Sequence, residues 1–223
     1  MMVGATSWQI RGTYLDNVHV ISDDLDFCEL LVYTWDLSTE ELLIKEMDAI
    51  TQKTTISVHL PTDTLENVKQ AVSFFEAFNC LNLTVHPFAD FKGLANYYFH
   101  YTQNSPKNRL SLENLEDNLF MEFTNYLGKE KNKLAITMDY GHLLYTGDSV
   151  EHFYNKFGPQ IREIHFHGAD KNNAHIYPNK ESLEGFVQFI KRHEELEKTP
   201  VCIELFHWPQ TQQLVKELKA YAG

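Results

Sequence analysis

Six segments that read as β-strands end on a side chain able to bind a metal ion or move a proton. In each, the residue two positions earlier is small or polar, as in Ser57-Val58-His59 and "TMD" at Asp139. Because successive strand residues alternate faces, the two members of each pair point to the same side. The six terminal residues are His59, His86, Glu113, Asp139, His165 and Glu204.

Three carboxylates and several imidazoles at one place would repel one another and be poorly solvated unless their charge were offset. Basic residues are nearly absent from these strand ends, since Arg109 lies at the start of its strand. A single histidine at a strand end is usually only a hydrogen-bonded structural residue, but the combination favours divalent metal. Mixed imidazole and carboxylate ligands suit Zn²⁺, Mn²⁺ or Fe²⁺ better than Ca²⁺.

Further histidines follow two of the strand ends. Gly141 permits a sharp turn after Asp139, so that His142 can face the same place from the loop. The segment "HFHGADKNNAH" adds His167 and His175 after the strand that holds His165. We therefore expect these histidines and the six strand-end residues to lie close together in one pocket.

Eight short apolar runs alternate with amphipathic segments, which predicts a parallel sheet with helices between its strands. Eight such units in 223 residues favour one small (β/α)₈ barrel over residues 1–223, with the polar strand ends at its carboxyl-terminal rim. An open doubly wound sheet is the alternative. The secondary structure of the segment Phe91–Lys107 is the least clear, because a Tyr/Phe cluster is followed by a Ser-Pro break. The predicted strands are Val3–Thr6, Phe27–Val32, Thr55–His59, Leu83–His86, Arg109–Glu113, Leu134–Asp139, Ile161–His165 and Val201–Leu205.

The amino-acid composition argues against some classes of function. Lys and Arg number 19 against 31 Asp and Glu, a net charge of −12, which argues against a nucleic-acid partner. There is no apolar run long enough to span a membrane and no signal-peptide pattern. Three widely spaced cysteines without a CxxC pair fit a reduced, cytoplasmic setting. A small-molecule substrate is the expected partner.

Taken together, "VHLP", "VHPF", "LENL", "MDYGH", "IHFHG" and "CIEL" resemble the endonuclease IV and xylose isomerase-like TIM barrels. In the phosphodiesterase branch, that resemblance implies up to three metal ions. His59, His86 and Glu113 would hold the first. Glu113 would be shared with a second ion bound by Asp139, His165 and Glu204. His142 and His175 would hold the third with an acid two residues before His175, where this chain has Asn173. Water, substrate or Asp170 could supply that missing ligand.

Finer features resemble the cobamide-remodelling phosphodiesterases: "GATSW", "DLDFCELLVY", "HLPTD", "LSLENL", "DYGHLLYTGD" and "IELF" follow in the same order. This resemblance implies hydrolysis of the nucleotide-loop phosphodiester of vitamin B12-type corrinoids, giving cobinamide phosphate and α-ribazole.

Within that scheme Glu113 is a candidate catalytic residue as the ligand that bridges two ions. His167 is the other, as a donor to the phosphate or the leaving group, with a structural role as the alternative. An aromatic wall suited to a flat base or a corrin ring is expected from tryptophans that follow neighbouring strands, together with Tyr33 and Phe206. The alternative is that the tryptophans only cover the barrel core. The predicted substrate-binding residues are Trp8, Trp35, Tyr140 and Trp208.

Three other functions fit parts of the pattern. A sugar or sugar-phosphate isomerase or epimerase of the same fold would use Glu113 and Glu204 around one Mn²⁺, but the additional imidazoles favour more than one ion. Repair of abasic DNA is disfavoured by the −12 charge. A corrinoid or metal carrier would bind without turnover.

Overall fold

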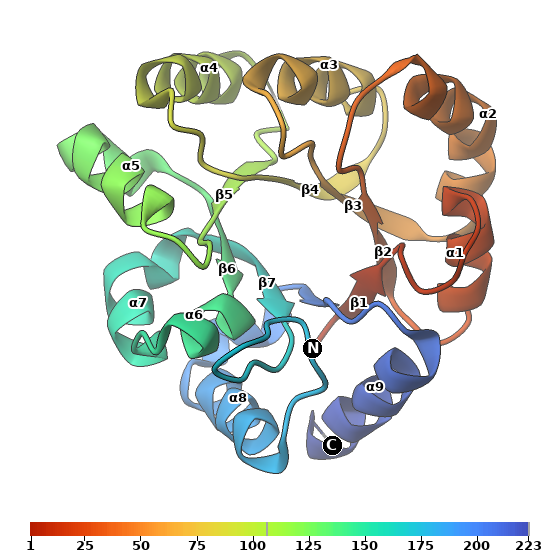
Figure 1. Cartoon of the computed structure of the whole chain (residues 1–223), viewed down its shortest axis with the longest axis vertical. Coiled ribbons are helices and arrows are strands. Elements are labelled where there is room, and N and C mark those ends of the chain that lie inside the picture. Colours follow the sequence, from red (N-terminus) through yellow and green to blue (C-terminus); the bar gives the residue numbers. More distant parts are fainter. Residues whose placement is uncertain (106, 223) are drawn as a thin grey trace.

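Eight parallel strands close into a barrel, and helices form a ring around it (Figure 1). This computed structural model describes residues 1–105 and 107–222. Each strand pairs with the next in the sequence, and β1 pairs with β8 to close the ring. The predicted (β/α)₈ barrel is confirmed, and the open doubly wound sheet is wrong. The strands are β1 Val3–Thr6, β2 Phe27–Leu31, β3 Thr55–His59, β4 Cys80–Val85, β5 Leu110–Glu113, β6 Ile136–Asp139, β7 Ile161–Phe166 and β8 Val201–Ile203.

Two strands differ from their predicted bounds in ways that matter for the mouth of the barrel. β4 starts at Cys80 and ends at Val85, so His86 is the first residue beyond it. β8 ends at Ile203, so Glu204 also follows its strand rather than lying within it. Both side chains therefore sit at the rim, where the Glu204 amide still donates to the Phe166 carbonyl of β7 at 3.1 Å.

Seven of the helices, α1 to α4 and α6 to α8, begin at a residue whose side chain caps the helix. The Thr13 hydroxyl and the Asp16 carboxylate form a reciprocal capping box at the start of α1. The unclear segment contains helix α4, whose Leu94 and Tyr98 are buried against the barrel; Pro106, within the predicted Ser-Pro break, lies outside the described residues. The helices are α1 Tyr14–Ile21, α2 Leu37–Lys53, α3 Leu65–Phe75, α4 Phe91–Asn104, α5 Leu119–Leu127, α6 Tyr140–Thr146, α7 Val150–Phe157, α8 Lys180–Arg192 and α9 Trp208–Ala222, with short 3₁₀ segments Gly128–Lys133, Gly158–Gln160 and Glu194–Lys198.

Polar side chains fill the barrel interior just below the mouth. The Ser57 hydroxyl of β3 donates to the Glu163 carboxylate of β7, 3.0 Å away across the barrel. The Asn82 amide of β4 donates to Thr137 of β6 at 3.0 Å. Ser57, Thr137 and Glu163 each precede a strand-end residue by two positions. Asn82 lies four positions before His86, on the same inward face. The predicted inward face is therefore confirmed for these strands, and the layer supports the rim from below.

Apolar side chains pack between the strands and the helices. The opposite face of each strand contributes buried residues such as Val58, Leu112 and Ile164. The core is thus an apolar shell around a polar interior, which allows charged groups to be held rigidly at the rim. No helix in the described ranges combines the length and the apolar character needed to cross a membrane.

Candidate metal centre

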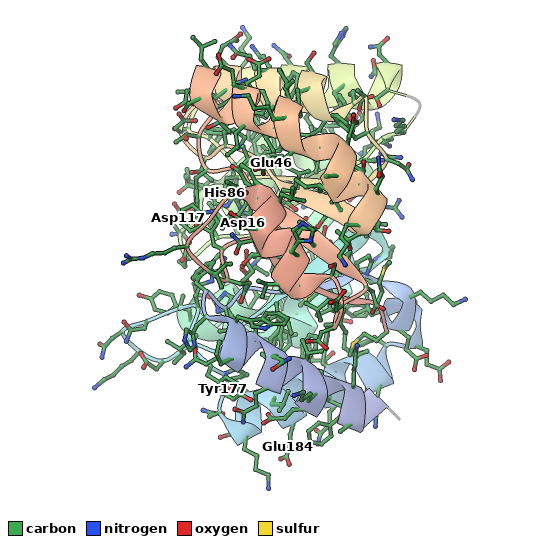
Figure 2. All side chains as sticks on the ribbon, turned by 90° about the vertical axis from the view of Figure 1, so that its right-hand side faces the viewer. Asp16, Glu46, His86, Asp117, Tyr177 and Glu184 are labelled. Carbon is green, nitrogen blue, oxygen red and sulfur yellow. The ribbon has the colours of Figure 1, made fainter. Side chains whose placement is uncertain are left out.

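The barrel brings together all six predicted strand-end residues, although they are spread over 146 positions from His59 to Glu204 (204 − 59 + 1). Five of them are buried, and His86 is half-buried at the rim. In Figure 2, His86 and Asp117, which follow β4 and β5, are labelled on the same side of the molecule, to the left. Parallel pairing is the cause, because it puts the carboxyl end of every strand on one side.

One group of possible metal ligands combines His59, His86 and Glu113. Both Nε2 atoms approach Oε2 of Glu113, at 3.2 Å for His59 and 2.9 Å for His86. The two Nε2 atoms lie 3.1 Å from each other. Nδ1 of His59 lies 3.2 Å from the Leu60 carbonyl, a contact that leaves Nε2 free to act as the ligand atom.

A second group combines Glu113, Asp139, His165 and Glu204, whose ligand atoms all lie within 4.8 Å of one another. Nδ1 of His165 is 2.7 Å from Oε1 of Glu113 and 3.4 Å from Oε1 of Glu204. Glu113 therefore directs one carboxylate oxygen to each group. This is the arrangement expected of a carboxylate that bridges two cations.

A third group consists of His142, His167 and His175. Nδ1 of His142 lies 3.0 Å from Oδ2 of Asp139, and Nε2 of His167 lies 3.2 Å from Oδ1 of the same residue. Nδ1 of His175 is 3.7 Å from Oε2 of Glu204. The third group thus adjoins the second through two of its carboxylates.

The donor set fits divalent metal ions. Five buried polar atoms in these groups have no well-aligned hydrogen bond within the described chain. Among the described residues, the ion pairs of Glu113 and Glu204 involve only histidines, without lysine or arginine. Unsatisfied buried polar atoms are costly, and metal coordination would satisfy them. They are Asp139 Oδ2, His142 Nε2, His167 Nε2, His175 Nδ1 and Glu204 Oε2.

Without metal, the carboxylates favour protonated imidazoles. Burial disfavours the charged form of His59, but the hydrogen bond and charge of Glu113 outweigh it and raise its pKa to about 9. For His142 burial is likewise outweighed, chiefly by Asp139 and then Glu116, and the pKa rises to about 10. Burial opposes ionisation of Glu113, yet the charge of His165 keeps its pKa well below the usual range. A metal ion must therefore displace protons to bind here.

His175 titrates in the opposite direction. Burial lowers its pKa, and the neighbouring positive charge of His167 adds to this, while Glu204 opposes it. His175 is therefore a neutral imidazole at neutral pH, which is the form that binds metal.

His167 is fully buried and has contacts on both ring nitrogens. Its Nδ1 lies 2.9 Å from the Gly168 carbonyl and 3.0 Å from the amide nitrogen of His175. Its Nε2 faces Asp139. This placement indicates that His167 holds Asp139 and the loop after β7 in position, and it does not favour direct contact between His167 and a substrate.

Gly141 has a different role from the predicted sharp turn. It lies within α6, and a Cβ atom there would come within 2.2 Å of the His167 ring. The glycine is needed for the close approach of this ring rather than for an unusual backbone angle.

The four predicted substrate-binding aromatics do not share one wall. Trp8 is 49% exposed at the mouth, and its ring centroid lies 4.9 Å from that of Tyr33 and 6.5 Å from that of Phe206. Trp35 instead packs on Phe74 and Phe75 in the core. Tyr140 is buried against Phe166, Phe186 and Phe189, and Trp208 is partly buried against the core.

The exposed aromatic cluster of Trp8, Tyr33 and Phe206 adjoins two of the candidate ligands. Tyr33 stands 6.0 Å from His59 between ring centroids, and Phe206 stands 5.4 Å from His175. Trp8 and Phe206 also line a hollow of about 600 Å³ that extends to Arg11 and Tyr14. The cluster therefore forms one side of the mouth, next to the imidazoles.

Sequence reasoning missed three polar residues that contact the candidate ligands. Oε2 of Glu29, in β2, lies 3.0 Å from Nε2 of His165. The Asn114 side chain donates to the Asp139 carbonyl and accepts from its amide, both at 2.9 Å. Glu116 approaches His142. The available signal was an acid inside the apolar run "FCELL" and the polar residues directly after Glu113.

The fold has many counterparts among solved structures. Neither a protein-family model nor a curated protein sequence matches the chain. A probable 3-DHS dehydratase from Bacillus anthracis is 15% identical with a TM-score of 0.70, over 100% of this chain and 99% of that one. A 3-keto-D-glucoside 4-epimerase from E. coli is 11% identical with a TM-score of 0.69, over 99% of both chains. An AP endonuclease of family 2 from Brucella melitensis is 12% identical with a TM-score of 0.63, also over 99% of both. At these identities the likeness concerns the fold alone, a (β/α)₈ barrel that proteins of several different names share.

Proposed function

We propose that this protein is a metal-dependent phosphodiesterase. The observation that carries the proposal is the position of Glu113, with one carboxylate oxygen toward His59 and His86 and the other toward His165. A carboxylate between two groups of ligands is suited to a pair of divalent cations. Two-cation sites serve phosphoryl displacement well, since the attacking and leaving oxygens both need charge stabilisation.

The bound ions would supply Lewis acidity and lower the pKa of water at the mouth. The residues of the chain fix the positions of the ligand side chains. Glu113 joins the first two groups, while Asn114 fixes the backbone of Asp139 through two hydrogen bonds. His167 orients the Asp139 carboxylate from the other side. The net charge of −12 makes these cations all the more important for an anionic phosphodiester.

For the substrate class, we propose the nucleotide loop of cobamides. The support is the order and spacing of the sequence motifs, together with the exposed cluster of Trp8, Tyr33 and Phe206 beside the candidate ligands. Aromatic faces bind flat ring systems by stacking, and both the lower-ligand base and the corrin ring are flat. Trp35 and Tyr140 would support the barrel instead of touching the substrate, because both are buried.

The test is product analysis by mass spectrometry after incubation with a B12-type cobamide and Zn²⁺ or Mn²⁺. We expect cobinamide phosphate and α-ribazole, and no products from Glu113→Gln. A generic aryl phosphodiester, bis(p-nitrophenyl) phosphate, is assayed in parallel. Cleavage of the generic ester alone would contradict the cobamide assignment, and failure with both substrates under every metal tested would contradict the phosphodiesterase.

A sugar isomerase or epimerase is the second candidate. The group formed by Glu113, Asp139, His165 and Glu204 could by itself hold one Mn²⁺ between two glutamates that exchange protons with carbon. Solvent-deuterium exchange into a panel of ketoses, followed by NMR, tests this directly. Incorporation without any phosphodiester cleavage would favour the isomerase over the phosphodiesterase.

A further inference from the structure

Glu116 lies in the loop that follows β5 and faces His142, a member of the third group of histidines. Its Oε1 is 3.1 Å from Nε2 of His142. The side chain is 43% exposed, so the carboxylate is open to solvent on one side and borders His142 on the other. Nothing in the family resemblance predicts an acid at this position.

His142 presents Nε2 to Glu116 as a potential ligand atom. Its other nitrogen, Nδ1, lies 3.0 Å from the Asn114 carbonyl oxygen, which can only accept a hydrogen bond. That contact places the proton of the neutral ring on Nδ1 and leaves the lone pair on Nε2. Nε2 is buried and has no well-aligned hydrogen bond.

His175, in the loop after β7, lies beside His142. Its backbone has φ of 53°, an uncommon angle for a residue other than glycine, and two hydrogen bonds between Gly168 and Ile176 brace this turn. The Nδ1 atom of His175 is buried without a hydrogen bond. Its ring centroid lies 5.3 Å from that of His142. The two imidazoles therefore converge, each with a buried nitrogen that lacks a well-aligned hydrogen bond.

The loop after β7 supplies no acid to complete them. Asn173 stands where the resemblance requires a carboxylate. Asp170 is exposed, and its Oδ1 accepts hydrogen bonds from the amides of Asn172 and Asn173, at 2.8 and 2.9 Å. This carboxylate is used to shape its own turn.

We propose that Glu116 supplies the carboxylate of a cation site with His142 and His175, so that the acid comes from the β5 loop instead of the β7 loop. Two histidines and one glutamate are a donor set that holds Zn²⁺ with a position open for water or substrate. The inference rests on the metal-dependent site proposed above, but not on the reaction that the site catalyses.

The test counts zinc ions per chain by inductively coupled plasma mass spectrometry, after loading with Zn²⁺ and desalting. We expect Glu116→Ala and His142→Ala each to hold one ion fewer than the wild type. Asp117→Ala, at the adjacent exposed acid, should match the wild type. The double variant Glu116→Ala/Asn173→Asp carries a carboxylate in the loop after β7 instead of the loop after β5. It should bind the zinc ion that Glu116→Ala lacks.

The zinc-induced rise in Tm gives a second readout that does not depend on turnover, because an ion bound only to the folded state stabilises it. Melting of the metal-free variants shows whether each one folds. An unchanged zinc count and Tm shift in Glu116→Ala would overturn the inference, leaving Glu116 as an ion-pair partner of His142. An equal loss in Asp117→Ala would overturn it as well. A wild-type protein inactive on phosphodiesters, yet losing one zinc in Glu116→Ala, would refute the proposed reaction and leave this site standing.

Discussion

At the scale of single residues, His165 is held between carboxylates on both ring nitrogens. Nδ1 faces Glu113 at 2.7 Å, and Nε2 faces Glu29 at 3.0 Å inside the barrel. A second carboxylate behind a ligating histidine fixes its tautomer and the direction of its ring. Glu29 is therefore a positioning residue for the candidate ligand.

Replacing Glu29 should weaken metal binding without touching a ligand. We expect Glu29→Ala to lower zinc affinity about 10- to 100-fold and to destabilise the protein by about 1–3 kcal/mol, because a buried N–H loses its acceptor. Isothermal titration calorimetry and chemical denaturation measure the two effects. Glu29→Gln keeps an acceptor oxygen and should lose less of both. Equal losses in the two variants would contradict positioning through this hydrogen bond.

Trp8 should contribute to substrate binding and little to folding. Trp8→Ala is expected to raise KM for the phosphodiester several-fold, since stacking on an exposed aromatic face is lost. Because the side chain is 49% exposed, the free energy of unfolding should change by less than about 0.5 kcal/mol. Leu37→Ala, at a residue 78% exposed in α2, is the control for surface truncation. Unchanged KM in Trp8→Ala would contradict the role of the cluster.

At the scale of elements, the mouth depends on a close approach between α6 and the end of β7. Gly141→Ala would force the added methyl into the His167 ring. We expect a loss of about 1–3 kcal/mol in stability, as for overpacking elsewhere, and weaker zinc binding because the ring must move away from Asp139. Gly185→Ala in α8, where the nearest atom is 3.6 Å away, should be neutral or stabilising. Similar stabilities of the two variants would contradict the packing account.

The alternation of strand residues was sufficient to predict which side chains reach the mouth. It could not predict Glu29 or Glu116, because their roles depend on neighbours from other strands. Glu29 meets His165 from β7, and Glu116 meets His142 from the segment after β6. The expected position of Trp35 at the mouth was wrong for a related reason, whereas Trp8 is exposed there. Trp35 follows β2 as expected, but it turns to α3, where Phe74 and Phe75 bury it.

At the scale of the whole molecule, the metal-free protein should lose stability as pH rises. The folded pKa of His59 is raised to about 9, above about 6.5 in the unfolded chain. Its contribution is therefore complete below about 6.5 and is lost as pH rises to about 9. Chelator-treated protein should show a falling Tm across this range, and His59→Gln should flatten the fall. A Tm that rises with pH here would contradict the ion-pair account.

The barrel as a whole could be predicted because eight βα units leave few other ways to bury their apolar faces. The aromatic mouth and the third group of ligands could be predicted only in part, since they are built by loops that no periodic pattern governs. The three histidines of that group and the cluster of Trp8, Tyr33 and Phe206 were expected at the mouth, but Glu116 and the inward turn of Trp35 were not. Asn173 is an example of what the sequence could not predict. The resemblance places a metal ligand at its position, but the carboxylate that faces His142 belongs to Glu116.

The central claim is that distant strands share cations through Glu113. The most direct measurement is the zinc content per chain of the wild type, Glu113→Gln and His86→Ala after identical loading. We predict that Glu113→Gln loses two ions, because both of its oxygens serve a group, whereas His86→Ala loses one. Wild-type protein that retains no zinc, or Glu113→Gln with the wild-type zinc content, would contradict the account.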